Sequence, residues 1–206
     1  MLFRSLLAWT TTPWTLPSNL ALAVNPDIDY SVLELDGRRS IVASGRCGAY
    51  EKEFAGATEV AVIRGSELVG RRYTPLFPYF ADTENAFRVL GADFVTVEDG
   101  TGVVHMAPGF GEDDQIACQA AGIPTLCPMD SRGCYTNEVT DWVGQHVFEA
   151  NPSVIRHLKE AGVVVRHDSY DHAYPHCWRC SEPLVYRAIS SWFVEVTRVK
   201  DRMLEL

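Results

Sequence analysis

The dipeptide Asp36-Gly37 separates two short strand-forming runs, residues 30–35 and 38–43, and this arrangement constrains the fold more than any other local feature. An Asp-Gly pair between two such runs is a strong signal of a β-hairpin, because both residues tolerate the positive φ angles of a tight turn. Further strands are predicted at residues 58–64, near Arg88 and at 94–97, and the first one within residues 1–8. Short strands divided by turn signals favour a sheet-rich domain.

Only a few helices are predicted. Residues 115–122 form one that ends at a glycine, with the acids of residues 112–114 in its first turn, where they suit the helix dipole. Asn151-Pro152 is typical of a helix start, and that helix would end at Gly162.

Two shorter segments complete the prediction. Ser44 would cap a short helix through Phe54, and residues 65–70 form a bounded turn. We therefore expect the α+β class, with a β-barrel core and peripheral helices.

Composition excludes several classes of protein. No stretch approaches the roughly 18 apolar residues of a membrane-spanning helix, so no membrane association is expected. A net charge of −9 opposes non-specific nucleic-acid binding, which depends on basic side chains at phosphates. Four of the six cysteines are scattered rather than regularly spaced, which favours packing roles and a cytoplasmic location: Cys47, Cys118, Cys127 and Cys134. Both ends read as interrupted elements, so we expect a piece of a larger protein.

Two polar segments carry the candidate chemistry. Thr10, Thr11 and Thr12 stand between Trp9 and Trp14, and each threonine hydroxyl supplies one donor and two acceptor lone pairs on a stiff stem. Such a run is suited to holding a polar substrate.

The second segment, residues 100–114, places His105 on a short apolar strand and Asp114 nine residues later, beyond a Pro-Gly-Phe-Gly bend. The bend can bring both side chains to one mouth, where a carboxylate can hold an ammonium group and a neutral imidazole can form a pocket wall. The alternative is a hydrogen-bonded core histidine and an ordinary helix-start acid, and spacing alone leaves both open.

A resemblance favours the first of these. Residues 9–19, 65–73 and 100–114 together resemble the editing (CP1) domain inserted in class I isoleucyl-tRNA synthetases, in the same order and over nearly the whole chain. The related valyl and leucyl inserts are expected to read Thr-Thr-Arg-Pro where this chain has Thr10-Thr11-Thr12-Pro13, and to have Lys or Met at the place of His105. The main departure is Gln115, where an aromatic or apolar residue is expected; it bears on helix packing and leaves the pocket unaffected.

The resemblance implies a proofreading hydrolase. A site that accepts isoleucine discriminates weakly against valine, because one methylene is worth only about 1–3 kcal/mol, a value for which the isoleucyl enzyme is itself a standard example. A second, smaller site would hydrolyse valyl-tRNA(Ile) by attack of water and would exclude isoleucine by size; valyl-adenylate is a further candidate substrate. Residues 1–170 would form this editing domain, and residues 171–206 the connection back to the synthetase body.

The same resemblance implies roles for individual residues. Asp114 would bind the α-ammonium, and His105 would line the side-chain pocket. The implied catalytic residues are Asp114, His105, Thr11 and Thr12, and the implied substrate-binding residues are Trp9, Thr10, Asn19, Gly102 and Val104. The partners would be the tRNA(Ile) 3′ end carrying valine and the remainder of the synthetase, with this chain monomeric.

Cys177 and Cys180 form a Cys-x2-Cys pair, which is half of a tetrahedral zinc site. His172 and His176 are near enough in sequence to complete it, but four ligands within nine residues would be cramped. We therefore expect no metal or other cofactor in this chain; zinc in the full-length enzyme would need partner cysteines from elsewhere.

Two alternative functions remain at this stage. One is a zinc-knuckle RNA-binding module centred on Cys177 and Cys180, which the negative charge and the single cysteine pair disfavour. The other is the editing domain of a valyl or leucyl enzyme, which Thr12 and His105 disfavour.

Overall fold

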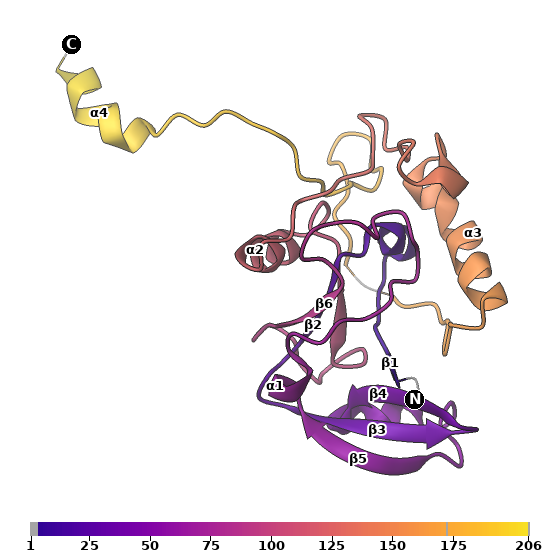
Figure 1. Ribbon diagram of the computed structural model, residues 1–206. Coiled ribbons are helices and arrows are strands. Elements are labelled where there is room, and N and C mark those ends of the chain that lie inside the picture. The colour runs from indigo at the N-terminus through magenta and orange to yellow at the C-terminus, as the bar shows by residue number, and fades with distance from the viewer. Residues whose placement is uncertain (1–3, 172, 206) are drawn as a thin grey trace.

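The computed structural model describes residues 4–171 and 173–205, and it combines two β-sheets with helices on their flanks (Figure 1). The α+β class predicted from the sequence is confirmed. The strands are β1 (Arg4–Leu6), β2 (Ala21–Val24), β3 (Asp29–Leu35), β4 (Arg38–Ala43), β5 (Thr58–Arg64), β6 (Arg88–Gly91) and β7 (Val103–Met106). The α-helices are α1 (Gly65–Leu68), α2 (Glu112–Ala120), α3 (Val147–Glu160) and α4 (Val196–Leu204), and the 3-10 helices are η1 (Pro13–Ser18), η2 (Ser44–Tyr50) and η3 (Thr140–Trp142).

The predicted hairpin organises the larger sheet. Strands β3 and β4 pair antiparallel on either side of Asp36 and Gly37, whose φ angles of 50° and 74° are the positive values that a tight turn needs. Strand β5 pairs with the other side of β3, and β1 adds to β4 in parallel, which gives the order β1-β4-β3-β5. The second sheet has the order β6-β2-β7, with β2 in its centre.

The two sheets are joined at one corner. The backbone N–H of Ala43, at the end of β4, donates to the carbonyl of Thr101, just before β7, at 2.9 Å. The strands of the described part of the chain pair as two open sheets, so the β-barrel core expected from the sequence is not seen there as a closed barrel. An apolar cluster fills the space between the sheets: Leu22, Val24, Tyr30, Val32, Ile41, Ala43, Leu68, Val89 and Val103.

Gly102 occupies the tightest point of this corner. Its φ is +73°, and a Cβ placed on it would lie 2.4 Å from the Cβ of Ala43. The hydroxyl of the buried Tyr30 donates to its carbonyl at 2.7 Å. Close packing and backbone conformation both require glycine here.

Replacing Gly102 by alanine should therefore lower the free energy of unfolding by more than the same change at Gly37. Gly37 has a nearly equal φ of +74°, but a Cβ added there would have no other atom within 4 Å, so Gly37→Ala measures backbone strain alone. We expect the extra loss at Gly102, from overpacking, to be about 1–3 kcal/mol, measured by urea denaturation. Equal losses for the two variants would show that the corner relaxes.

The prediction of a strand at residues 94–97 is wrong. The backbone there is irregular, and side chains instead of a neighbouring strand bind carbonyl groups in and next to this segment. Asn25 donates to the carbonyl of Val95 at 3.0 Å, and Arg46 donates to that of Glu98 at 2.8 Å.

The helix predicted to start at Asn151-Pro152 begins four residues earlier, at Val147. His146 is its N-cap and accepts the N–H of Phe148 at 3.4 Å, while Pro152 lies inside the helix. The Asn151 side chain has a tertiary role instead: its Oδ1 accepts the N–H of Trp14 at 2.9 Å. The helix ends at Glu160, two residues before the predicted end at Gly162, and the prediction of α2 with its first-turn acids is confirmed.

Two short segments also differ from expectation. Residues 44–50 form a 3-10 helix, and Ser44 does not cap it, since its hydroxyl pairs with that of Ser31 at 2.7 Å. Residues 65–68, expected as a turn, form the single helical turn α1.

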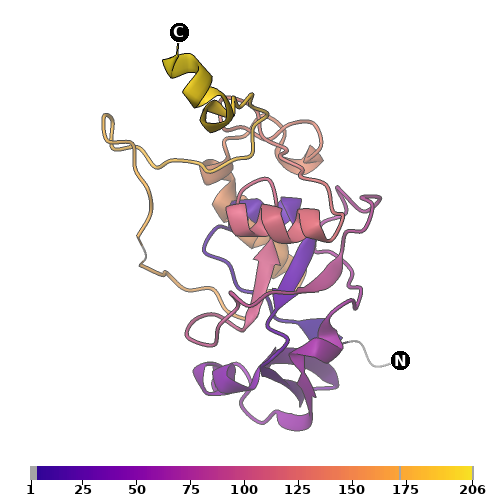
Figure 2. The same ribbon diagram turned by 90° about the vertical axis from the view of Figure 1, so that its left-hand side faces the viewer.

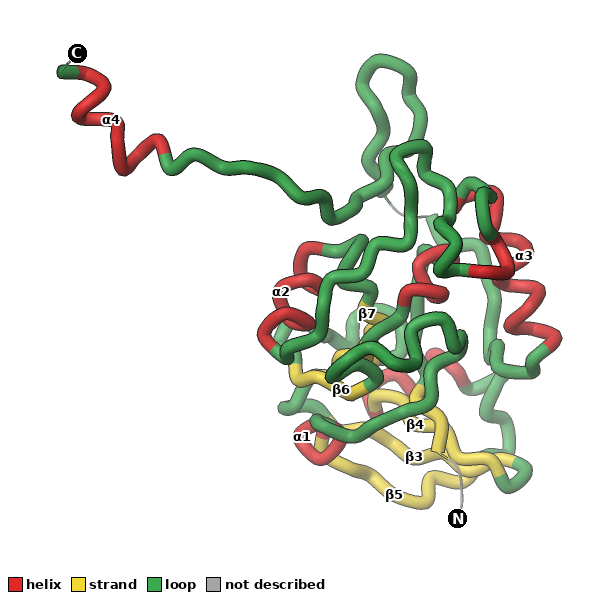
Figure 3. The backbone as a smooth tube through the Cα atoms, turned by 45° about the horizontal axis from the view of Figure 1, so that its top comes forward, coloured by secondary structure: helices red, strands yellow, loops and turns green. Residues whose placement is uncertain are grey.

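The last part of the chain leaves the body of the structure. After α3 the backbone runs extended, and α4 lies apart from both sheets with none of its described residues buried (Figures 1 and 2). In Figure 3 most of the segment between α3 and α4 is loop. It still contacts the body, because the N–H of Ala188 donates to the carbonyl of Gly109 at 2.8 Å. No helix among the described residues is long and apolar enough to cross a membrane.

Candidate active site

Thr10, Thr11 and Thr12, here called the threonine wall, follow β1 and lead into η1, beside strand β7. Trp9 forms a parallel bridge with Val104, so the segment that carries the threonines is held against the strand that carries His105. Gly100 supports this contact, because a Cβ there would lie 2.9 Å from the indole ring of Trp9. The ring itself is partly exposed, and Tyr170 packs against it edge-on at 5.3 Å between centroids.

His105 lies at the centre of a chain of hydrogen bonds that starts in the threonine wall. Its Nε2 lies 2.9 Å from the Thr15 hydroxyl, and its Nδ1 lies 2.8 Å from the Asn19 side-chain nitrogen. The Thr12 hydroxyl lies 3.2 Å from that of Thr15, and the Thr10 hydroxyl lies 3.3 Å from that of Thr12. The structure thus brings together four of the predicted site residues, Thr10, Thr12, Asn19 and His105.

Sequence reasoning missed two members of this network. Thr15 connects the threonine wall to His105, and its position three residues after Thr12, one turn of η1, was the available signal. Tyr73 donates its hydroxyl hydrogen to Asn19 Oδ1 from the connection between α1 and β6. No local pattern pointed to Tyr73.

Thr11 and Asn19, two predicted site residues of this region, differ in exposure and in hydrogen bonding. The Thr11 side chain is exposed, and its hydroxyl makes no hydrogen bond to any described residue. Asn19 is buried, and its amide is occupied by protein groups, including the carbonyl of Ala21 at 2.8 Å. Of the remaining predicted binding residues, Gly102 is buried in the sheet corner and Val104 is half-buried on β7.

Asp114 is held next to the same strand. It stands in the first turn of α2, and its Oδ2 accepts the N–H of Ala107, two residues after His105, at 2.7 Å. Gly111 allows this approach, because a Cβ there would lie 3.0 Å from the Asp114 Cγ. Oδ1 of Asp114 accepts no hydrogen bond from the part of the chain that the structure describes.

The two ionisable groups of the site are shifted in ways that burial explains. Burial lowers the pKa of His105 from its ordinary 6.5 to about 4, so the imidazole is neutral at physiological pH. Burial raises the pKa of the Asp114 carboxyl, the Ala107 N–H opposes the rise, and the neighbouring Asp113 charge adds to it. The site therefore offers one neutral ring and one carboxylate that gains from pairing with a cation.

The His105 shift predicts a pH dependence of stability. The unfolded chain takes up this proton near pH 6.5 and the folded chain only near pH 4, so folding loses stability as pH falls through that window, by about 3 kcal/mol in total. Denaturation of the wild type and of His105→Gln between pH 7 and pH 4 measures the effect. The difference between them isolates His105, because Asp114, whose raised pKa gives the opposite slope, is common to both. Parallel curves would contradict the assignment.

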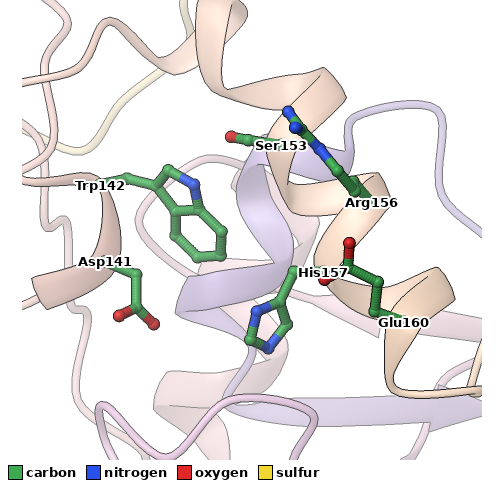
Figure 4. A pocket seen from close by; sticks show the side chains of 6 residues that line it. All are labelled: Asp141, Trp142, Ser153, Arg156, His157 and Glu160. Carbon is green, nitrogen blue, oxygen red and sulfur yellow. The ribbon is translucent and has the colours of Figure 1, made fainter.

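Two surface hollows lie elsewhere, against α3. The one in Figure 4 is about 370 Å³ and is lined by Asp141, Trp142, Ser153, Arg156, His157 and Glu160. His157 there packs on the rings of Phe77 and Trp142, with centroids 5.4 and 5.9 Å away. None of the predicted site residues lines either hollow, and we place the candidate site at the hydrogen-bonded network instead.

Cys177 and Cys180 lie in a loop of the C-terminal segment. Backbone N–H groups of Cys180 and Arg179 facing the Cys177 thiol lower its pKa. His176 hydrogen-bonds through Nδ1 to the carbonyl of Ser181 at 2.7 Å, and His172 lies outside the described residues. The described residues gather no group of three or more His, Cys, Asp or Glu side chains that could hold a metal ion, so they do not by themselves fit a structural zinc ion, which needs four ligands.

The chain is similar to isoleucine–tRNA ligases over nearly its whole length. It is 53% identical to the enzyme of Mycobacterium tuberculosis over 98% of the chain, 54% identical to that of Corynebacterium diphtheriae over 97%, and 52% identical to that of Rickettsia felis over 98%. It spans only about a fifth of the length of these relatives, 19–20%. No family model matches the chain.

Solved structures give the fold. The crystal structure of GlLeuRS-CP1 superposes with a TM-score of 0.63 at 16% identity, covering 82% of this chain and 85% of that one. The editing domain of the Plasmodium falciparum cytosolic leucyl-tRNA synthetase superposes with a TM-score of 0.58 at 10% identity, covering 77% of each. At these identities the likeness speaks for the fold, and the sequence relatives speak for the family: the chain belongs to the isoleucyl-tRNA synthetases, as the segment that has the editing-domain fold.

Proposed function

We propose that this chain hydrolyses the ester of tRNA(Ile) that has been charged with valine by mistake. The observation that carries the proposal is the Asp114 carboxylate: it is half-buried, has one oxygen free of hydrogen bonds to described residues, and is tied to the backbone two residues from the neutral His105. A half-desolvated carboxylate favours a cationic partner, and an aminoacyl ester carries an α-ammonium next to the bond that is to be cut.

In this proposal each side of the site has its own task. Asp114 binds the α-ammonium, and His105 walls the pocket for the aliphatic side chain without adding charge. Thr10, Thr11 and Thr12 hold the ester, the terminal adenosine and the attacking water. Trp9 and Val104 form the surface beside these threonines, and Gly102, which is buried in the sheet corner, supports that surface from behind. Hydrolysis proceeds by oriented water, since the ammonium already activates the ester, and needs no covalent nucleophile.

Selectivity would come from size. A pocket closed by the buried His105 ring admits valine and overlaps with the extra methylene of isoleucine. The site that attaches isoleucine discriminates weakly against valine, because a missing methylene loses only about 1–3 kcal/mol of binding. In a small, rigid editing pocket the extra methylene of isoleucine overlaps with the wall, and this overlap costs more. Valyl-adenylate, which carries the same amino-acid portion, is a second candidate substrate.

The proposed partners follow from the family. They are the 3′ end of tRNA(Ile) and the remainder of a synthetase, which would supply most of the affinity for the tRNA body, since this chain carries a net charge of −9. The proposal includes a monomeric chain and a cytoplasmic location, where tRNA is charged. Zinc at Cys177 and Cys180 would need two ligands from residues beyond the described ones.

A binding titration tests the proposal. Non-hydrolysable valyl-adenosine and isoleucyl-adenosine analogues are added to the ¹⁵N-labelled chain, and the amide signals of Thr11, His105 and Asp114 are followed. We expect the valyl form alone to shift all three signals. Equal binding of both forms would refute the size filter. A chain that is silent to both, but binds RNA only when zinc is added and salt is low, would favour the RNA-binding alternative.

A further inference from the structure

The hydrogen bonds around His105 have a direction that two backbone carbonyls fix. The first is the carbonyl of Ala21, which can only accept. The Asn19 side-chain atom that faces it at 2.8 Å must therefore be the NH₂ group. The same NH₂ faces His105 Nδ1 at 2.8 Å, so Nδ1 must be the acceptor.

It follows that the ring hydrogen is on Nε2. A neutral imidazole has one donor and one acceptor nitrogen, and the burial of His105 keeps it neutral. Nε2–H then donates to the Thr15 oxygen at 2.9 Å. The Thr15 hydroxyl can accept it because its own hydrogen goes to the second fixed acceptor, the carbonyl of Thr12, at 2.8 Å.

Tyr73 closes the other end of the chain. Its hydroxyl donates to Asn19 Oδ1, the only face of that amide which the Ala21 carbonyl and His105 leave. Burial raises the pKa of the Tyr73 phenol, which keeps it protonated and able to donate. Both the nitrogen and the oxygen of the Asn19 amide are thus hydrogen-bonded, by groups from different parts of the chain.

The same direction extends into the threonine wall. Because the Thr15 hydrogen is used, the Thr12 hydroxyl must donate to Thr15 across their 3.2 Å contact. Thr10 must then donate to Thr12 across 3.3 Å, and the Thr10 oxygen also accepts the N–H of Thr12 at 3.0 Å. Each of these two hydroxyls has spent its hydrogen and keeps one acceptor lone pair.

We propose that Asn19, Thr15 and Tyr73 are positioning residues: together they hold His105 as the Nε2–H tautomer, and the Thr15 hydroxyl, whose hydrogen is already used, orders Thr12 and Thr10 so that these two present acceptor lone pairs and no donor to a ligand. What binds to the Thr10 and Thr12 oxygens must then be a hydrogen-bond donor, such as water or a ribose hydroxyl, and an anionic oxygen is disfavoured there. This deepens the proposed function, on which it rests: a water molecule that donates to these oxygens turns its own lone pair outward, toward the ester carbon.

Nitrogen NMR of the histidine ring tests the tautomer without any tRNA. In the wild type at pH 7 the long-range ¹H–¹⁵N spectrum of His105 should show a protonated Nε2 and an unprotonated Nδ1. Asn19→Asp keeps the size but places an acceptor opposite Nδ1, so Nδ1 should become protonated. A wild-type ring protonated on Nδ1, or an Asn19→Asp ring that is not, overturns the proposal.

A matched control separates the expected change of the His105 tautomer from a general effect of an Asn→Asp substitution. Asn25→Asp makes the same chemical change at another Asn that donates to a backbone carbonyl, that of Val95, and should leave the His105 spectrum unchanged. Should Asn19→Asp fail to fold, Thr15→Val removes the acceptor of Nε2–H while keeping the shape. Its ring should keep the same tautomer, and Nε2–H should exchange with water faster than in Thr15→Ser, which retains the acceptor.

Activity adds a readout that distinguishes the two proposals. Thr15→Val and Tyr73→Phe should lower kcat for valyl-tRNA(Ile) hydrolysis by roughly two- to tenfold, the scale of one hydrogen bond, with KM little changed, and Thr15→Ser should restore kcat. The predicted tautomer in a chain without deacylase activity would refute the proposed function alone. Full activity with the opposite tautomer would refute the positioning role alone.

Discussion

Replacing Asp114 by asparagine should reduce hydrolysis of valyl-tRNA(Ile) by about 30-fold to several thousandfold. The removal of one member of a buried charge pair costs about 2–5 kcal/mol, because the α-ammonium of the substrate would then be desolvated without a partner. The raised pKa of Asp114 shows that its environment already disfavours an unpaired charge, so the carboxylate gains from the ammonium more than an exposed acid would.

Asparagine is a sharper test than alanine at this position. Oδ2 of Asp114 accepts the N–H of Ala107 at 2.7 Å, and an amide oxygen can still do so, whereas alanine would leave that N–H unpaired. Loss of activity in Asp114→Asn therefore reports the missing charge. The control is Asp113→Asn, which removes an exposed acid from the same first turn of α2.

The measurement is the rate of deacylation of valyl-tRNA(Ile) by the wild type and both variants, with stability checked by denaturation. Asp113→Asn should stay close to wild type. Near-normal deacylation by Asp114→Asn would show that the carboxylate does not bind the substrate ammonium, and the assignment of the site would fail.

Replacing His105 by alanine should act in the opposite direction, on the correct product. Isoleucyl-tRNA(Ile), which the wild type spares, should be hydrolysed roughly 10- to 200-fold faster, the range by which pockets discriminate a single methylene. The reason is space: the ring of His105 is only 7% exposed and fills the volume beside Thr15, so its removal enlarges the pocket.

A size-conserving variant provides the control. His105→Gln keeps most of the volume and can still hydrogen-bond with Asn19 and Thr15, so isoleucyl ester should remain protected. His105→Ala also removes one hydrogen-bond partner from Asn19 and one from Thr15, at a cost of about 1–3 kcal/mol each in stability, so its assay temperature must stay below the onset of unfolding. If His105→Ala hydrolyses isoleucyl-tRNA(Ile) as slowly as His105→Gln does, then His105 is not the size filter.

Local sequence signals predicted the elements whose formation is decided locally. The Asp36-Gly37 turn sets the register of β3 and β4 by its backbone geometry alone, and both strands form where expected. Helix α2 likewise follows from acids in its first turn and a glycine after its end.

The failed predictions have a common physical cause. Asn151-Pro152 has the sequence of a helix start, but the Asn151 side-chain oxygen is engaged by Trp14, 137 residues away. Residues 94–97 have the composition of a strand, but the side chains of Asn25 and Arg46 occupy carbonyl groups in and next to this segment. In each case tertiary hydrogen bonds engage groups whose partners lie far away in the sequence, so the local pattern does not register them.

The sequence by itself determined the family resemblance, the hairpin, and the set of polar residues at Thr10–Thr12, His105 and Asp114, because each of these is written in contiguous residues. Only the tertiary structure decided how they connect. His105 meets Thr15 across 90 positions of sequence and Asn19 across 86, and Tyr73 reaches Asn19 across 54. Such contacts depend on how two sheets and η1 pack together, and with them the tautomer of His105 and the directions of the Thr10, Thr12 and Thr15 hydroxyls are set.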